Sequence, residues 1–355
     1  MIEFDCVSLS LGDFSLKDLT FEISKGEYYF ILGPSGAGKT VILEAIAGLH
    51  RPDSGKIFIR GTDVSLVAPE KRRISLVYQD YSLFPHMTVY ENIAFGLCMQ
   101  KAGKDEIYGA VSEMMERLGI SHLKDRYPLT MSGGEQQRVA LARSLVVKPE
   151  ILLLDEPLSA MDPGTREKFM SDLRRLHEDF GITIVQVTHS RDEAWSLASR
   201  IAVVSNGKLE QEGTLEEVFR KPVNCIVGKF VGIENVLDGI VVNNPGGLGS
   251  IIDIHGVKIR SACDFESGEK IHAYLRGVDI VLSPDMSGSN VENFFYGRVL
   301  SVTPHNSLYR VYVDCGFHLC SLLTEREVDA MKIEAGQNVC VFFEESAVHL
   351  TGRES

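Results

Sequence analysis

The 355-residue sequence predicts an α/β domain with a mainly parallel sheet, followed by a small all-β domain. Strand-like and helix-like runs alternate over about the first 230 residues, which is typical of strands joined by crossover helices. A glycine-rich loop directly follows a short apolar run at residues 28–32. Beyond residue 236, short β-rich runs alternate with glycine-containing turns, a pattern typical of small barrels. We therefore expect two domains, 1–232 and 233–355.

The first elements follow from apolar runs and from the residues that interrupt them. Residues 28–32 are expected to form a short buried strand that leads into the glycine loop, and residues 41–49 the helix after it. Residues 151–154 are a second apolar run, which ends at two carboxylates. This run is expected to be another buried strand of the same sheet.

The later elements carry clear start and stop signals. Asp162 and Pro163 have the residue types of a helix N-cap and first helical position, and Gly181 is placed to end that helix. The β-branched run at 182–187 predicts the next strand. Residues 201–209 predict a hairpin whose Asn-Gly pair matches a type I′ turn.

Two segments of the β domain begin alike and indicate one or two small barrels made of related units. These segments are Gly239-Ile240-Val241 and Gly297-Arg298-Val299. The segment from Cys315 to Cys320 allows two interpretations, a metal site or a tight turn between strands. We favour the turn because the segment lacks a fourth metal ligand.

Composition and charge narrow the class of protein. The net charge of −13 argues against nucleic acid as the main partner, because phosphate neutralisation needs clustered lysine and arginine. The seven cysteines are scattered and odd in number, which indicates reduced thiols in a cytosolic protein. The sequence has neither an apolar run of about 20 residues nor the start typical of a signal peptide.

The glycine-rich loop fits the phosphate-binding pattern G-x-x-x-x-G-K-[ST]. Its residues are Gly33, Pro34, Ser35, Gly36, Ala37, Gly38, Lys39 and Thr40. The glycines let backbone N–H groups approach phosphate, and the N-terminus of the following helix adds its positive dipole. A chance glycine-rich turn is the alternative, but the strand before the loop, the helix after it and the Lys-Thr pair disfavour it.

Further candidate residues follow the loop in the chain. Ser132, Gly133, Gly134 and Glu135 open a predicted helix as a second anion-binding loop. Asp155 and Glu156 follow the strand at 151–154, at the edge where parallel sheets place ligands. His189 ends another apolar run, and Gln79 lies about 40 residues beyond the phosphate loop.

In this order, the motifs resemble those of the ATP-binding subunits of ABC transporters. Segments 81–86 and 230–237 are most similar to importers of molybdate or tungstate. The resemblance implies a P-loop ABC ATPase domain with a helical signature subdomain at about 82–150. It also implies an OB-like regulatory domain of the TOBE or MOP type at 233–355.

The resemblance also implies roles for the candidate residues, with ATP and Mg²⁺ as cofactors. The catalytic residues would be Lys39, Glu156 and His189, with Glu156 polarising the attacking water. Mg²⁺ would be held by Thr40, Gln79 and Asp155. The loop that begins at Ser132 would contact ATP bound by a second copy of the chain.

The partners implied by the resemblance are those of an import system. They are a second ATPase subunit, two transmembrane permease subunits and an external solute-binding protein, with the chain on the cytoplasmic face of the membrane. The segment from Tyr81 to Val89 would receive the permease. Importers of iron, polyamine, sugar or sulfate stay open as alternatives. A soluble ABC protein is disfavoured, because one cassette is present and only 93 positions separate Lys39 from Ser132.

Two departures from the family pattern affect ligand binding. Leu11 stands where an aromatic residue usually stacks on adenine, so either Phe14 replaces it or adenine packs on an aliphatic surface. Glu344 occupies a lysine position of the oxyanion-sensing pattern, whereas Ser346 is kept. Residues 236–355 carry sixteen acidic and nine basic side chains, a setting that disfavours a dianion.

Overall fold

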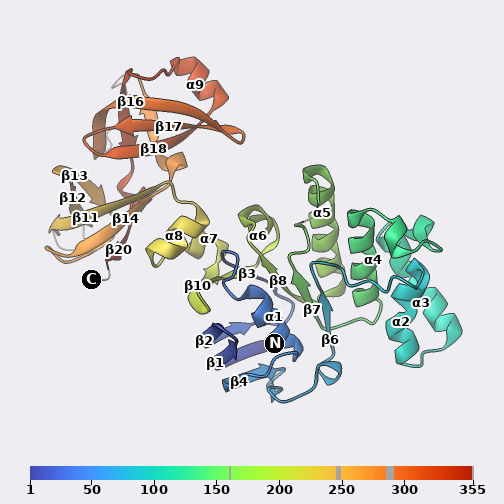
Figure 1. The fold of residues 1–355 in the computed structure, drawn as a ribbon. Helices are drawn as coiled ribbons and strands as arrows, with labels where there is room; N and C mark the ends of the chain where they lie inside the picture. Colours follow the sequence, from blue (N-terminus) through green and yellow to red (C-terminus); the bar gives the residue numbers. More distant parts are fainter. Residues whose placement is uncertain (160, 245–248, 285–291, 354–355) are drawn as a thin grey trace. The chain divides into compact units, whose positions relative to one another are not determined.

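The computed structural model describes residues 1–159, 161–244, 249–284 and 292–353 (Figure 1). Its contacts divide the chain into two units, Met1–Val218 and Phe219–Ser355. Helix α8 (Cys225–Val231), which the sequence boundary at 232 assigns to the first domain, belongs to the second unit. The physical reason is close packing: a Cβ atom at Gly228 would lie 2.7 Å from a ring carbon of Tyr274.

A six-stranded, mainly parallel sheet forms the centre of the first unit, as the sequence predicts. Its order is β10-β9-β3-β8-β7-β6, with only β10 antiparallel to its neighbour. Strands β3, β7 and β8 are buried along their whole length, which explains why most of their side chains are apolar. The strands are β3 (Tyr28–Leu32), β6 (Ile74–Val77), β7 (Ile151–Asp155), β8 (Thr183–Thr188), β9 (Arg200–Ser205) and β10 (Lys208–Thr214).

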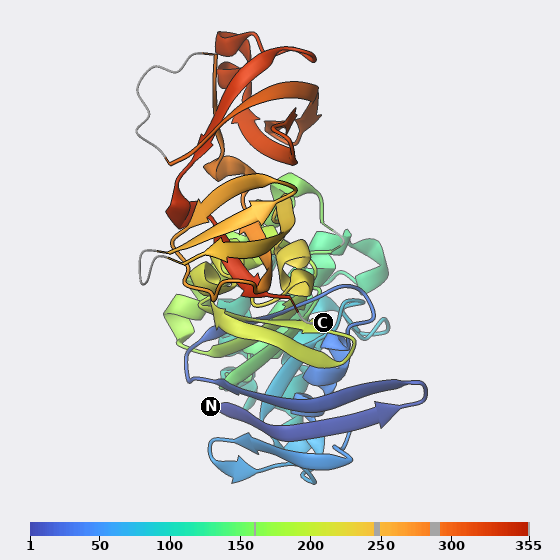
Figure 2. The same cartoon turned by 90° about the vertical axis from the view of Figure 1, so that its left-hand side faces the viewer.

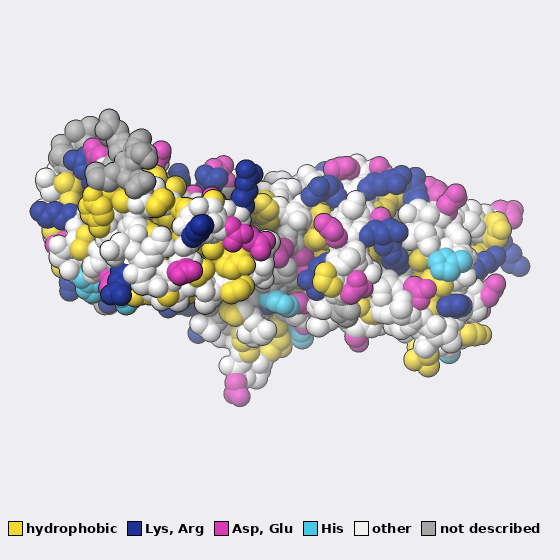
Figure 3. Space-filling model, turned by 90° about the horizontal axis from the view of Figure 1, so that it is seen from above, with side chains coloured by type: hydrophobic (Ala, Val, Ile, Leu, Met, Phe, Trp, Pro, Cys, Tyr) yellow, Lys and Arg dark blue, Asp and Glu magenta, His cyan; other side chains and the backbone are white. Residues whose placement is uncertain are grey.

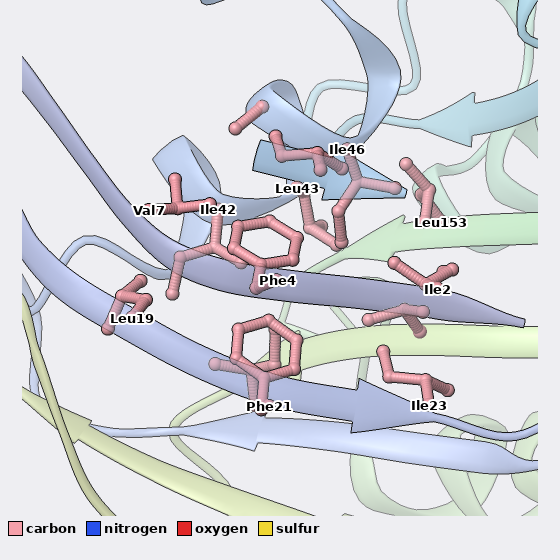
Figure 4. Packing of buried hydrophobic residues seen from close by; sticks show 14 of the residues in the cluster. Ile2, Phe4, Val7, Leu19, Phe21, Ile23, Ile42, Leu43, Ile46 and Leu153 are labelled. Carbon is pink, nitrogen blue, oxygen red and sulfur yellow. The ribbon is translucent and has the colours of Figure 1, made fainter. Parts of the chain in front are cut away.

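A second sheet of the first unit, which was not predicted from the sequence, is antiparallel with the order β2-β1-β4-β5. Figure 2 shows the long β1–β2 hairpin with β4 beside it. Helix α1 (Lys39–Ala47) packs its apolar side chains on both sheets; Figure 4 shows Ile42 and Ile46 near Phe4 of β1 and Leu153 of β7. The strands are β1 (Ile2–Leu11), β2 (Phe14–Ile23), β4 (Ser54–Ile59) and β5 (Thr62–Asp63).

The remaining helices of the first unit include the helical region predicted at about 82–150. That region holds α2 (Val89–Met99), α3 (Lys104–Arg117) and α4 (Gly133–Leu145), with one-turn helices η2 (Ser121–Leu123) and η3 (Pro128–Thr130). Elsewhere are η1 (Pro69–Lys71), α5 (Pro163–Phe180) and α6 (Arg191–Leu197). Helix α7 (Leu215–Arg220) spans the boundary between the two units. No helix among the described residues has the length and apolar character needed to span a membrane.

The start and stop signals act as expected. The Asp162 side chain accepts a hydrogen bond from the Thr165 N–H at 3.1 Å, and α5 ends at Gly181 with φ 57°. Strands β9 and β10 form the predicted hairpin, with positive φ at both Asn206 and Gly207, as a type I′ turn requires. Helix α1 begins at Lys39, two residues before the predicted start.

The second unit consists of two antiparallel five-stranded sheets that share one apolar core. Their orders are β13-β12-β11-β14-β20 and β15-β19-β16-β17-β18. The first sheet has β11 (Asn235–Asn243), β12 (Ser250–Ile254), β13 (Val257–Ser261), β14 (Lys270–Leu275) and β20 (His349–Gly352). The second has β15 (Val281–Ser283), β16 (Asn293–His305), β17 (Leu308–Asp314), β18 (His318–Thr324) and β19 (Asn338–Phe343). Helices η4 (Gly277–Asp279), α9 (Glu325–Met331) and η5 (Glu345–Ala347) complete the unit.

The two similar sequence segments occupy equivalent places in these sheets. Gly239 lies on β11 and Gly297 on β16, and each strand is the central one of its sheet. A Cβ atom at Gly239 would lie 2.5 Å from Ile252, and one at Gly297 would lie 2.4 Å from Val313. Both glycines therefore admit a neighbouring side chain against the backbone, which supports two related units.

The segment from Cys315 to Cys320 contains the predicted tight turn. Asp314 at the end of β17 pairs with His318 at the start of β18, and Gly316 between them has φ 87°. All seven cysteines are free thiols.

On the face seen in Figure 3, basic side chains are interspersed with acidic ones.

Candidate nucleotide site

The glycines of the phosphate-binding loop are required by its backbone. Gly36 and Gly38 have φ of 79° and 101°, a region that residues with a side chain rarely adopt. At Gly33, a Cβ atom would lie 2.2 Å from the carbonyl oxygen of Val204 on β9. The loop between β3 and α1 therefore favours glycine at these three positions, because any side chain would be strained at Gly36 and Gly38 and would clash at Gly33.

The ring of Phe14 lies against the loop. A Cβ atom at Gly38 would be 2.4 Å from Cζ of Phe14, and Phe14 pairs with Leu11 across the β1–β2 hairpin. The two residues named as candidates for adenine contact are thus neighbours at one end of the hairpin. The Cζ and Cε1 atoms of Phe14 lie nearest to the loop, so Phe14 supplies an aromatic ring there, which Leu11 lacks.

Lys39 points its ammonium group at the loop backbone. Its Nζ donates to the carbonyl oxygens of Gly33 at 2.9 Å and Pro34 at 3.0 Å, and the residue is 7% exposed. Burial lowers the pKa of Lys39, while the negative charges of Glu156 and Asp155 oppose that shift. A concentrated positive charge therefore lies at the N-terminus of α1, where phosphate binding is favoured.

Thr40 and Asp155 bring oxygen atoms together beside Lys39. The Thr40 hydroxyl lies 3.1 Å from both carboxylate oxygens of Asp155. Asp155 is 5% exposed, and burial is the main cause that raises its pKa. A cluster of hard oxygen donors with an incompletely compensated buried carboxylate is the kind of site that a divalent cation stabilises.

Glu156 and His189 form a close pair. The Nδ1 atom of His189 lies 2.8 Å from the Glu156 carboxylate, and because a carboxylate only accepts, Nδ1 is the donor. Glu156 has φ 45°, which is costly for a residue with a side chain. Its N–H donates to the Val187 carbonyl at 3.0 Å, and its carbonyl accepts from the Ser159 hydroxyl at 2.9 Å. The surrounding bonds thus hold a strained backbone that aims this side chain at His189.

A buried polar network supports the strand that carries His189. The Tyr28 hydroxyl donates to Gln186 at 2.6 Å, and the Gln186 amide donates to Glu193 at 2.9 Å. Gln186 is fully buried, and burial raises the pKa of Glu193. Sequence reasoning missed this network; its one signal was a glutamine inside an otherwise apolar strand.

Gln79 lies at the same edge of the sheet. Strand β6 pairs with β7 in parallel, with Val77 opposite Leu154, so Gln79 and Asp155 both follow the carboxyl ends of neighbouring strands. Gln79 is exposed. The structure therefore brings the phosphate loop, Asp155, Glu156 and His189 together and places Gln79 at the adjoining strand end.

The residues from Ser132 to Glu135 form a separate loop at the start of α4. The Ser132 hydroxyl accepts from the Glu135 N–H at 3.3 Å, while the Glu135 carboxylate accepts from the Ser132 N–H at 2.8 Å. A Cβ atom at Gly133 would be 3.9 Å from the Tyr81 hydroxyl, and one at Gly134 would be 3.5 Å from Thr165. Among the hydrogen bonds of the described residues, none joins this loop to the phosphate loop.

The chain is similar in sequence to two protein families and to individual import ATP-binding proteins. A family model described as ABC transporter matches residues 16–159, and one described as TOBE domain matches residues 289–350. The chain is 42% identical to the molybdate/tungstate import ATP-binding protein WtpC of Pyrococcus abyssi, over 98% of this chain and 99% of that protein. It is 39% identical to the spermidine/putrescine import ATP-binding protein PotA of Chromobacterium violaceum, over 98% and 95%.

A solved structure is also similar to the first part of the chain. The ATP-binding cassette MJ0796, as a dimer bound to ADP and phosphate in a post-hydrolysis state, is 32% identical to this chain. The match covers 61% of this chain and 99% of that one, with a TM-score of 0.56. The TOBE match, residues 289–350, lies within the second unit.

Proposed function

The chain belongs to the ATP-binding subunits of ABC importers, and we propose that its ATP hydrolysis energises uptake of molybdate or tungstate. Near-complete coverage of the Pyrococcus abyssi relative is the observation that carries this proposal. A polyamine substrate is the second candidate, because the Chromobacterium violaceum relative is matched over an equal share of this chain.

Residues 33–40 would wrap the phosphates of ATP. The backbone N–H groups of the glycine positions and the N-terminus of α1 supply donors for the phosphate oxygens. Lys39 already points into the loop, within hydrogen-bond distance of two of its carbonyls. On ATP binding, its ammonium would transfer from these carbonyls to the terminal phosphates.

The oxygen cluster fits Mg²⁺ by its donor chemistry. Thr40, Asp155 and Gln79 would hold the ion, directly or through water, which is consistent with hard oxygen ligands at one sheet edge. When bound, Mg²⁺ would neutralise charge on the phosphate oxygens. Its positive charge would also favour the ionised form of Asp155, whose burial works against ionisation.

Glu156 would orient the water that attacks the terminal phosphate, and His189 would contact that phosphate. The 2.8 Å hydrogen bond from Nδ1 to Glu156 orients the ring of His189. Nε2 is then the ring nitrogen that would face the terminal phosphate. The left-handed backbone of Glu156 supports a functional role, because strained residues that the fold holds in place cluster at active sites.

We further propose that two copies of the chain complete each site. The loop at Ser132 has the features of an anion-binding helix start, yet its hydrogen bonds do not reach the phosphate loop of its own chain. A two-fold dimer would bring this loop to the partner's ATP. The dimeric state of the similar MJ0796 cassette supports this arrangement.

Two permease subunits and an external solute-binding protein would complete the system. The permease would bind the docking segment, residues 81–89, at the cytoplasmic face of the membrane. Asn92, which is fully buried, supports a defined shape for this segment. Its amide accepts from the Phe84 N–H at 2.9 Å and donates to the carbonyls of Phe84, Met87 and Thr88 at 3.0–3.1 Å.

Reconstitution with the permease and binding protein tests the substrate. In proteoliposomes that contain ATP on the side of this chain, molybdate or tungstate should be taken up and should stimulate ATPase activity. Uptake of spermidine in place of the oxyanions would favour the second candidate. Stimulation by neither class would contradict both assignments while leaving the ATPase itself intact.

The loop at Glu344 predicts weak feedback by oxyanions. The Ser346 hydroxyl donates a hydrogen bond to the Glu344 carboxylate at 3.3 Å. The hydroxyl that an anion would use is therefore already bonded to an acidic side chain. Millimolar molybdate or tungstate should therefore leave the ATPase of the assembled transporter uninhibited, and Glu344→Lys should shift it toward inhibition. Glu334→Lys, which makes the same charge change outside this loop, is the control. Inhibition of the unmodified complex by micromolar oxyanion would contradict this prediction.

A further inference from the structure

The start of the docking segment has a strained backbone. Tyr81 has φ 62° and Ser82 has φ 41°, so two consecutive residues with side chains adopt the left-handed conformation. Residues of this kind keep such a conformation only where the surrounding structure fixes it. The pair stands directly between Gln79 at the nucleotide site and the part of the segment that Asn92 holds.

Arg143 of α4 fixes both strained residues. Its guanidinium donates to the carbonyl of Ser82 at 2.9 Å and to that of Tyr81 at 3.2 Å. The same group lies over the ring of Phe84, 5.1 Å from the ring centre. One planar cation therefore contacts three residues of the docking segment, a geometry that matches the fork of arginine and not the single ammonium of lysine.

The contact joins the docking segment to the loop at Ser132. Arg143 lies in the last turn of α4, and Ser132 caps the first turn of the same helix. Tyr81 reaches that loop a second way, because its side chain is 8% exposed and its hydroxyl lies beside Gly133. The segment is thus hydrogen-bonded to the last turn of α4 through Arg143, and its Tyr81 hydroxyl lies close to the first turn at Gly133.

We propose that Arg143 is a positioning residue, which holds the left-handed turn at Tyr81–Ser82 and makes the docking segment and α4 move together. Displacement of the segment by a bound permease would then move Ser132 relative to the partner's ATP. This inference rests on the proposed function, since it assigns the docking segment to a permease. Arg143 itself lies away from the reacting atoms and acts through Tyr81 and α4.

The test compares Arg143→Lys with Arg117→Lys. Arg117 is a control because its guanidinium, like that of Arg143, lies over an aromatic ring, that of Phe180. Its described ion pairs go to the carboxylates of Glu113 and Asp179, not to the docking segment. Arg143→Lys should lower permease-stimulated ATPase activity by about tenfold, the size expected for a lost hydrogen bond to a charged group. ATP binding by the isolated chain should be unchanged, and Arg117→Lys should behave as the unmodified protein.

A rescue variant separates positioning from general destabilisation. Glycine adopts φ 41° without strain, so adding Ser82→Gly to Arg143→Lys should restore part of the stimulated activity. Amide hydrogen exchange at residues 80–84 of the isolated chain should accelerate in Arg143→Lys and not in Arg117→Lys. The proposal would be overturned if Arg143→Lys changed neither amide exchange at residues 80–84 nor permease-stimulated ATPase activity. It would also be overturned if Ser82→Gly failed to restore the stimulated activity that Arg143→Lys loses. If the unmodified chain shows no permease stimulation, the proposed function has failed, and the exchange measurement still decides the role of Arg143.

Discussion

Replacing Glu156 with glutamine is expected to leave ATP binding intact and to lower hydrolysis by ~10²-fold or more, on the scale of general-base catalysis. Glutamine keeps the shape of the side chain and can keep a hydrogen bond to His189, but it loses the charge that polarises water. The contacts that hold the backbone at φ 45° involve main-chain atoms of Glu156, so they persist in the variant. The variant should therefore accumulate as an ATP-bound dimer.

A steady-state ATPase assay measures the loss of hydrolysis, and nucleotide titration measures ATP binding. Light scattering measures the accumulation of the ATP-bound dimer. Glu44→Gln is a suitable control, because Glu44 lies on α1 and its charge contributes to the raised pKa of Asp155. Removing that charge should change hydrolysis only a few-fold, since the described bond of the Glu44 carboxylate goes to His50 and not to Glu156 or His189. Near-normal turnover in purified Glu156→Gln would contradict the assigned role.

Lys39→Ala and Ser132→Arg should each abolish hydrolysis, but for different reasons. Loss of the Lys39 ammonium removes a charged hydrogen bond to phosphate worth up to about 3 kcal/mol, so ATP binding should weaken by up to ~10²-fold. Ser132→Arg should leave the phosphate loop of its own chain able to bind ATP. Because this change also removes a helix cap, Thr324→Ala, which breaks an equivalent capping box in the second unit, is the control. ATP binding lost in Ser132→Arg to the same degree as in Lys39→Ala would contradict this division of roles.

The elements that sequence alone could predict are those with contiguous signals. The apolar run 28–32 followed by glycines, the Asp162-Pro163 start and the Asn206-Gly207 turn each specify a local backbone conformation, and the structure has all three. The antiparallel sheet at the N-terminus was missed because it forms through distant pairing. Strand β1 pairs with β4, which lies more than 40 residues later in the chain, so the local sequence of either strand does not indicate its partner.

Within the candidate site, the motif residues could be named from sequence but their supports could not. The left-handed backbone of Glu156 and Tyr81 has no sequence signal, because neither position is glycine or asparagine. The contact between Arg143 and Tyr81 joins residues 62 positions apart. The predicted domain boundary at 232 was also wrong, because the boundary between the units lies at Val218. The sequence of α8 does not indicate that this helix packs on Tyr274 of the second unit.

Mixing Lys39→Ala chains with Ser132→Arg chains tests most directly whether two copies form each catalytic site. In a mixed dimer, both lesions fall on one composite site and the other site is intact. With random pairing, equal mixing should restore about a quarter of the unmodified activity if one intact site turns over alone. The recovered activity should fall on dilution as dimers dissociate. If the mixture stays inactive at concentrations where dimers form, or if either single variant hydrolyses ATP at a rate independent of its partner, the two-chain site is wrong for this protein.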